Sequence, residues 1–105
     1  MIKDKNLLKI KEVIKNIFPD CRIILFGSRS RNDFNSQSDY DILVIINNNM
    51  EVKEKRYYAS IIMDKLAEME ILTDVIVRTE KDIDYYKEKI GSITREAISE
   101  GISLW

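Results

Sequence analysis

Two aspartates separated by one residue, Asp39 and Asp41, form the most informative pair of side chains in the sequence. Asp41 lies within a run of aliphatic and β-branched residues, 40–46, which predicts a strand. Alternate side chains of a strand point to the same face, so the two carboxylates should share one face and Tyr40 should point to the other. Two like charges at this spacing repel each other unless a cation lies between them. The pair therefore indicates a site for a divalent cation such as Mg²⁺.

A third carboxylate, Asp74, interrupts the apolar run 71–77. A charge in such a strand is out of place unless it faces a site or a solvated edge. Sheet pairing could bring Asp74 beside Asp39 and Asp41, and three carboxylates on adjacent strands can hold two metal ions about 3.5–4 Å apart. That arrangement stabilises both the attacking and the leaving oxygen during displacement at phosphorus. The alternative interpretation of Asp74 is an ordinary surface acid on a strand.

A glycine and a serine, Gly27 and Ser28, directly follow a second apolar run, 21–26. Glycine permits close approach of the backbone, and the serine hydroxyl and the free amides of a following helical turn suit a phosphate group. A Gly-Ser pair is also a common turn, so the pair is weak evidence without the downstream acids. Arg29 or Arg31 could neutralise phosphate charge, although arginines on a polar loop are often simply solvated.

The scarcity of histidine and cysteine limits the kinds of catalytic and metal sites that this chain can form. The sequence has no histidine and only one cysteine, Cys21. Ser-His-Asp and Cys-His catalysis are therefore excluded, and a zinc site is disfavoured. The remaining candidates are carboxylates, hydroxyls and amines together with a hard cation. A lone cysteine also excludes an intramolecular disulfide, and we expect Cys21 to lie in the core of a cytoplasmic protein.

Length and charge bound the class of protein. The chain has 105 residues and a formal net charge of −1, so we expect one domain, 1–105, without the broad basic surface of a nucleic-acid-binding protein. Stable nucleic-acid binding is not expected. No signal peptide is recognisable, and no segment approaches the ~20 apolar residues of a membrane span.

The periodicity of apolar residues places these candidates on a mixed set of elements. We expect an α/β (α+β) fold, with a small mixed sheet and helices packed mainly on one face. Helical spacing predicts helices, and short apolar runs predict strands. The predicted helices are 4–18, 51–70, one from Thr79 or Asp82 to Ile90, and one from Ser92 to Glu100; the predicted strands are 21–26, 40–46, 71–77 and, more weakly, 102–105.

In combination these residues resemble a known family. The order Gly27-Ser28, ten residues, Asp39-x-Asp41 and later Asp74 is similar to the signature of the minimal nucleotidyltransferase (MNT) family of the DNA polymerase β superfamily. The likeness covers nearly the whole chain. The sequence departs from the family at Ser30 and Asn32, where members often have a small residue and a second glycine; asparagine tolerates a left-handed backbone and can preserve the turn.

The resemblance implies a nucleotidyltransferase fold and a reaction. The Gly27 amide and the Ser28 hydroxyl would hold the terminal phosphates of ATP, with Arg29 beside them. Asp39 and Asp41 would bind Mg²⁺, and Asp74 would hold a second Mg²⁺ and help to deprotonate the acceptor hydroxyl. Attack on the α-phosphorus would transfer AMP and release pyrophosphate.

The resemblance also implies a partner. Standalone MNT proteins resemble antitoxins of HEPN ribonuclease toxins, and such antitoxins can transfer AMP to a tyrosine of the toxin. Two alternatives remain: a catalytically silent antitoxin that acts by binding, and nucleotide transfer to a small molecule or an RNA end. Aromatic residues could contribute to a partner surface, although core packing or ordinary exposure explains most such residues; they are Tyr57, Tyr58, Tyr85, Tyr86 and Trp105.

Overall fold

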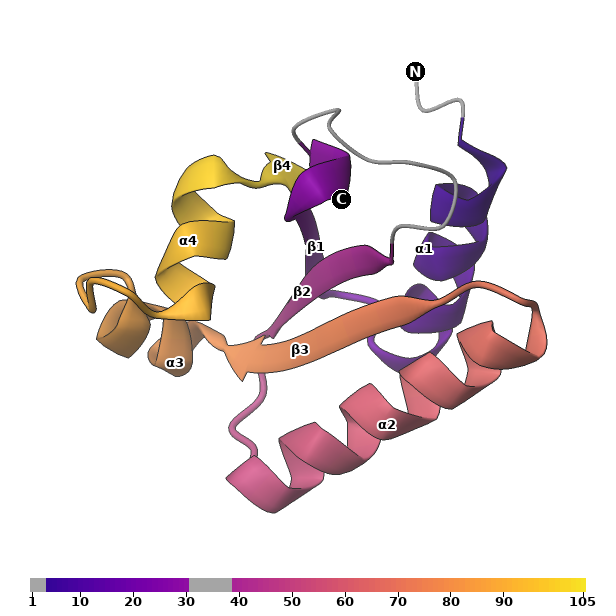
Figure 1. Ribbon diagram of the computed structural model, residues 1–105. Coiled ribbons are helices and arrows are strands. Elements are labelled where there is room, and N and C mark those ends of the chain that lie inside the picture. Colours follow the sequence, from indigo (N-terminus) through magenta and orange to yellow (C-terminus); the bar gives the residue numbers. More distant parts are fainter. Residues whose placement is uncertain (1–3, 31–38) are drawn as a thin grey trace.

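The computed structural model describes residues 4–30 and 39–105. In chain order the elements are α1 (Lys5–Ile17), β1 (Arg22–Phe26), the 3₁₀ turn η1 (Ser28–Ser30), β2 (Tyr40–Ile46), α2 (Val52–Glu68), β3 (Thr73–Thr79), α3 (Glu80–Tyr86), α4 (Ile93–Glu100) and β4 (Ile102–Ser103). The strands form one mixed sheet in the order β3-β2-β1-β4 (Figure 1). β1 is antiparallel to β2 and β4, whereas β2 and β3 are parallel.

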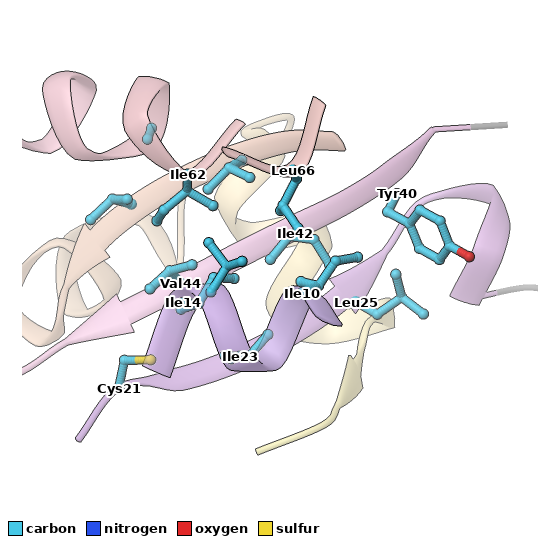
Figure 2. Packing of buried hydrophobic residues seen from close by; sticks show 14 of the residues in the cluster. Ile10, Ile14, Cys21, Ile23, Leu25, Tyr40, Ile42, Val44, Ile62 and Leu66 are labelled. Atoms are coloured by element: carbon cyan, nitrogen blue, oxygen red, sulfur yellow. The ribbon is translucent and has the colours of Figure 1, made fainter. Parts of the chain in front are cut away.

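The two longest helices, α1 and α2, cover one face of the sheet with the larger core. Alternate residues of the strands supply that face, as the period of two requires. Figure 2 shows their side chains meeting those of both helices, with Cys21 near one end of the cluster and Tyr40 near the other. Complete burial of one aliphatic side chain contributes about 1.5–3 kcal/mol, so this cluster is the main stabilising element. The prediction that Cys21 lies in the core is confirmed.

The two short helices, α3 and α4, cover part of the opposite face. The remaining alternate residues of β1 and β2 point to this opposite face and pack against α4. Together they form a smaller buried cluster of Ile24, Phe26, Leu43, Ile45 and Ala97. The predicted mixed α/β fold class is thereby confirmed. Asp41 and Asp74 share this second face, at the end where β2 and β3 begin.

Side-chain caps begin the helices where the sequence predicts them. Asp4 accepts a hydrogen bond from the Asn6 N–H at 2.9 Å and begins α1. Thr79 and Asp82 form a reciprocal capping box at the start of α3, and the Ser92 hydroxyl caps α4. Each cap satisfies a backbone N–H that has no partner within its helix, which is worth about 1 kcal/mol.

Several predicted boundaries shift in the structure: α2 ends at Glu68 rather than at residue 70, β3 ends at Thr79 rather than at residue 77, and β4 ends at Ser103 rather than at residue 105. β3 begins at Thr73 rather than at residue 71, because Glu70 adopts a positive φ of 62° and Ile71 is buried in the turn that leaves α2. The helix predicted to reach residue 90 ends at Tyr86, and the chain then turns through Gly91 at φ 88°. A pattern of apolar residues cannot separate a buried turn from a strand end.

Within residues 4–30 and 39–105, no helix combines the length and the apolar character needed to cross a membrane.

Candidate active site

The parallel pairing of β2 with β3 sets Asp41 directly beside Asp74. The two residues are Cα partners in the ladder, and partners in a parallel pair direct their side chains to the same face. On the other side of Asp41, the antiparallel partner is Phe26 of β1. The end of the sheet therefore carries a row of one aromatic ring and two carboxylates. Asp74 is exposed and Asp41 is partly exposed, so both can be reached from solvent.

Asp39 lies one residue before β2 and is exposed. The ladder extends beyond β3 here, because the N–H of Tyr40 donates to the carbonyl of Leu72 at 3.1 Å. Among the residues that the structure describes, no three acidic or cysteine side chains are gathered closely enough to hold a metal ion. The structure thus brings Asp41 and Asp74 together on one face, while the complete set of three carboxylates around metal stays a prediction.

Gly27 packs its backbone against the carboxylate of Asp41. Its φ is 72°, a left-handed conformation that favours glycine. A Cβ at this position would overlap Oδ2 of Asp41 and lie 3.0 Å from its Cγ. Glycine is therefore required on two independent grounds, backbone conformation and space.

The turn after Gly27 is closed by its own carbonyl. The N–H of Ser30 donates to the Gly27 carbonyl at 3.2 Å, and the Ser30 hydroxyl donates to the same oxygen at 2.8 Å. Ser28 begins this turn. Ser30, which departs from the residue common in the family, is thus accommodated by a hydrogen bond that holds the turn. Arg31, the other candidate phosphate-binding arginine, and Asn32, the predicted turn residue, lie outside the described residues.

Arg29 is held against the first residue of β2. Its guanidinium carbon lies 3.9 Å from the centroid of the Tyr40 ring, a cation–π contact. The Tyr40 hydroxyl in turn donates to Oδ2 of Asp4 at 2.7 Å, while the other Asp4 oxygen caps α1. Burial and this hydrogen bond to Asp4 raise the pKa of Tyr40, so the phenol stays protonated.

Sequence reasoning missed this support of the site. The sequence predicted correctly that Tyr40 and Asp41 point to opposite faces of the sheet, since Tyr40 is buried at 4% exposure on the α1 side. The contacts of Tyr40 join the start of α1, through Asp4, and the turn η1, through Arg29, to the start of β2. No periodic pattern in the sequence predicts contacts between these three segments. For these contacts, the sequence marked only Asp4, as the first residue of the predicted helix 4–18.

Comparisons with known proteins agree with this geometry. A family model of the nucleotidyltransferase domain matches residues 7–99. The chain is similar to a proposed protein adenylyltransferase of Methanocaldococcus jannaschii, with 30% identity over an alignment of length 79 that covers 67% of this chain and 80% of the relative. The chain therefore belongs to the nucleotidyltransferase domain family and is a nucleotidyltransferase. The family resemblance predicted from the sequence is confirmed.

Solved structures share the fold. One is a proposed nucleotidyltransferase from Sulfolobus solfataricus, with a TM-score of 0.60 and 24% identity, covering 100% of this chain and 91% of the other. Another comes from the complex of a tri-AMPylated Shewanella oneidensis HEPN toxin with an MNT antitoxin, with a TM-score of 0.57 and 20% identity, covering 95% of this chain and 69% of the other. At this identity the likeness establishes the fold.

Proposed function

We propose that this chain is a Mg²⁺-dependent adenylyltransferase that transfers AMP from ATP to a tyrosine hydroxyl of a cognate HEPN-type toxin and thereby acts as an antitoxin. The observation that carries the proposal is the pairing of Asp41 with Asp74 beside the Gly27 turn. The similarity to the proposed protein adenylyltransferase of Methanocaldococcus jannaschii supports adenylyl transfer, and the AMPylated toxin complex supports the choice of acceptor.

The carboxylate oxygens at the proposed site are suitable ligands for Mg²⁺. Carboxylate oxygens are the ligands that this ion prefers, and Asp41 and Asp74 present them from neighbouring positions of one face. Asp39 lies two residues before Asp41 on the same chain and would add a third carboxylate. When bound, Mg²⁺ would neutralise the charge of the triphosphate and of the departing pyrophosphate.

The chain's own groups would then position the reactants. The backbone amides of the Gly27 turn would hold the phosphates, and Gly27 lets this turn lie directly against the Asp41 carboxylate. Arg29 belongs to this turn, and its guanidinium, held by the Tyr40 ring at the end of the sheet, would pair with the negative phosphates. These contacts would fix the α-phosphorus in line with the incoming hydroxyl, and such positioning lowers the barrier without covalent participation of the protein.

Asp74 would take the proton of the acceptor. It is the exposed member of the pair and belongs to β3, at the edge of the sheet, where a partner protein can reach it. As the hydroxyl proton passes to a carboxylate oxygen of Asp74, the acceptor oxygen bonds to the α-phosphorus. The bond from that phosphorus to the bridging oxygen breaks, and pyrophosphate leaves with the electron pair.

The test weighs the acceptor after reaction. The protein is incubated with ATP, Mg²⁺ and a HEPN-type protein encoded in the same genome, and both chains are analysed by intact mass spectrometry. We expect the HEPN-type protein to gain one or more AMP units, on a tyrosine that fragmentation identifies. Asp41→Asn should abolish the gain, whereas Asp84→Asn, which alters an exposed acid of α3, should not.

Other outcomes would replace the proposal. Neutralisation of the toxin by Asp41→Asn protein without any mass gain would show a silent antitoxin that acts by binding. AMP found only on a small molecule or on RNA would show a different acceptor class. The structure offers one reason to include the first outcome, since its described residues hold no preformed cluster of three acids.

A further inference from the structure

Apolar side chains lie on both sides of Asp74 along its strand. Residues of β3 alternate between the two faces of the sheet, and the alternation continues back to residue 72. Ile71 is buried in the larger core, on the face of α1 and α2, whereas Leu72 is 62% exposed. The Leu72 carbonyl accepts from the N–H of Tyr40, so the backbone there still runs beside β2. Leu72, Asp74 and Ile76 therefore share one face, with about 6.5–7 Å between successive members.

Both apolar side chains can be reached from outside. Ile76 packs on one side against the smaller buried cluster beneath α4, yet it is only partly buried. It also lines a groove of about 310 Å³ beside β3. In Figure 1, α3 and α4 lie toward the end of β3, away from the beginning of the strand, where Leu72 and Asp74 are exposed. We call Leu72 and Ile76 the apolar flanks of Asp74.

The order of the strands fixes the side from which an acceptor must enter. Displacement at phosphorus places the attacking and the leaving oxygen roughly in line, on opposite sides of the phosphorus. In the proposed reaction the phosphates lie at the Gly27 turn, which follows β1. Because β2 lies between β1 and β3, pyrophosphate leaves on the β1 side of Asp41 and the acceptor enters on the β3 side. The group that carries the acceptor hydroxyl then lies beside Asp74, against its apolar flanks.

The apolar flanks distinguish between classes of acceptor. A tyrosine hydroxyl is attached to an apolar ring, which would cover Leu72 and Ile76 and remove their surface from water. A ribose or another sugar carries further hydroxyl groups, which would lose hydrogen bonds to water on that surface without gaining partners. A polynucleotide would also bring phosphates, and the segment 71–77 has no cationic residue to pair with them. This side of the site therefore favours a phenol.

We propose that Leu72 and Ile76 are specificity-determining residues, which hold the aromatic ring of the acceptor tyrosine while its hydroxyl reaches Asp74. The spacing fits, because the distance along the strand from Asp74 to either flank is comparable with the length of a tyrosine side chain. The inference rests on the proposed function and deepens it. It names the residues that select the acceptor, and it gives a physical reason why sugars and RNA ends are poor acceptors.

The first test measures binding without transfer. The leucine and isoleucine methyl groups of the full chain are isotope-labelled, and N-acetyltyrosine amide is titrated in the presence of Mg²⁺ and a non-hydrolysable ATP analogue. Because an aromatic ring above a methyl group moves its NMR resonance upfield, we expect saturable upfield shifts for Leu72 and Ile76. Ile93, which is 57% exposed at the start of α4, should not shift. N-acetylphenylalanine amide should give comparable shifts, and N-acetylserine amide should give none.

A matched pair of variants tests the role of Leu72 in transfer. Leu72→Ser and Val52→Ser make the same kind of change at similarly exposed residues, 62% and 58%, and Val52 begins α2 on the other face of the sheet. We expect Leu72→Ser to raise the KM for N-acetyltyrosine amide about tenfold and to change the KM for ATP less than about twofold, since one apolar contact is lost on the acceptor side alone. Val52→Ser should leave both KM values near those of the parent. Because both side chains are exposed, both variants should fold.

The outcomes separate this inference from the proposed function. Upfield shifts of Leu72 and Ile76 without any transfer of AMP would support the role of the apolar flanks and reject the proposed reaction. Transfer to tyrosine without these shifts, or with an unchanged KM in Leu72→Ser, would overturn that role and leave the reaction standing. Equal shifts with N-acetylserine amide would also overturn it. Shifts that appear as the protein concentration rises, without any acceptor, would instead assign Leu72 to a contact between two copies of the chain.

Discussion

The carboxylate of Asp41 fills the space in which residue 27 would carry a side chain. A Cβ on Gly27 would overlap Oδ2 of Asp41, and the Gly27 backbone is left-handed at φ 72°. Gly27 at the start of the turn and Asp41 near the start of β2 are therefore in direct contact, with no room for a side chain between them. Any residue other than glycine must displace either the turn or the carboxylate.

Gly27→Ala should abolish transfer of AMP and lower the free energy of unfolding by about 1–3 kcal/mol, because it adds both backbone strain and a collision with Asp41. Gly91→Ala is the matched control. Gly91 also has a positive φ, 88°, but a Cβ there meets no atom within 4 Å. It should lose about 1 kcal/mol and keep full activity. Urea unfolding and intact mass measure the two effects, and equal activity of both variants would contradict the steric argument.

Removal of Mg²⁺ should show whether Asp41 and Asp74 both belong to the metal site. In the presence of a non-hydrolysable ATP analogue, Mg²⁺ should raise the melting temperature of the parent chain, and EDTA should reverse the rise, because a ligand that binds the folded state stabilises it. Asp41→Asn and Asp74→Asn should each lose most of this rise, whereas Asp84→Asn should retain it. A rise that persists unchanged in Asp74→Asn would show that Asp74 does not contribute to the metal site.

The sequence was sufficient to predict the strands that carry the acids, but not every feature of their surroundings. The alternation of Asp39, Tyr40 and Asp41 predicts the shared face, because strand geometry has a fixed period. The pairing of Asp41 with Asp74 required β2 and β3 to be parallel neighbours, which is a property of the whole sheet. The contacts of Tyr40 with Asp4 and with Arg29 were not predicted either. Asp4 and Tyr40 are 36 positions apart in the sequence, and no local pattern relates them.

Lys55 illustrates the same limit. The helical pattern of α2 places lysines on the solvent side. Lys55 is nevertheless only 8% exposed, and it forms an ion pair with Asp82 of α3. A local pattern reports which residues share a helical face, but it cannot report which later element covers that face. Charge pairs between distant elements therefore need the folded structure.

Tyr40→Phe should reduce stability without removing activity. The change deletes the hydroxyl that donates to Asp4 at 2.7 Å but keeps the ring under Arg29. We expect a loss of about 1 kcal/mol in urea unfolding, the usual contribution of one such hydrogen bond, and a transfer rate within about twofold of the parent. Tyr40→Leu removes the ring as well and should lower the rate further. Equal rates for Phe and Leu would show that the contact with Arg29 does not support the site.

The Lys55–Asp82 pair should make folding sensitive to acid. Partial burial by itself would raise the pKa of Asp82, but the hydrogen bonds from Lys55 and from the Thr79 N–H outweigh it and lower the pKa below 3.8. A carboxyl whose pKa is lower in the folded state stabilises the protein above its unfolded pKa, and this contribution is lost as the pH falls through the folded pKa. Asp82→Asn should therefore cost about 1–3 kcal/mol at pH 7, because it leaves the buried Lys55 without its anion.

That cost should shrink as the pH is lowered below about 4, where the parent itself loses the charge of Asp82. Urea unfolding at a series of pH values measures the convergence of parent and variant. Asp84→Asn, which changes an acid of α3 whose contact with Lys87 is exposed, should run parallel to the parent over the whole range. A constant difference between the parent and Asp82→Asn down to about pH 2 would show that the ionisation of Asp82 does not stabilise the fold, and that the amide disturbs the start of α3 by another route.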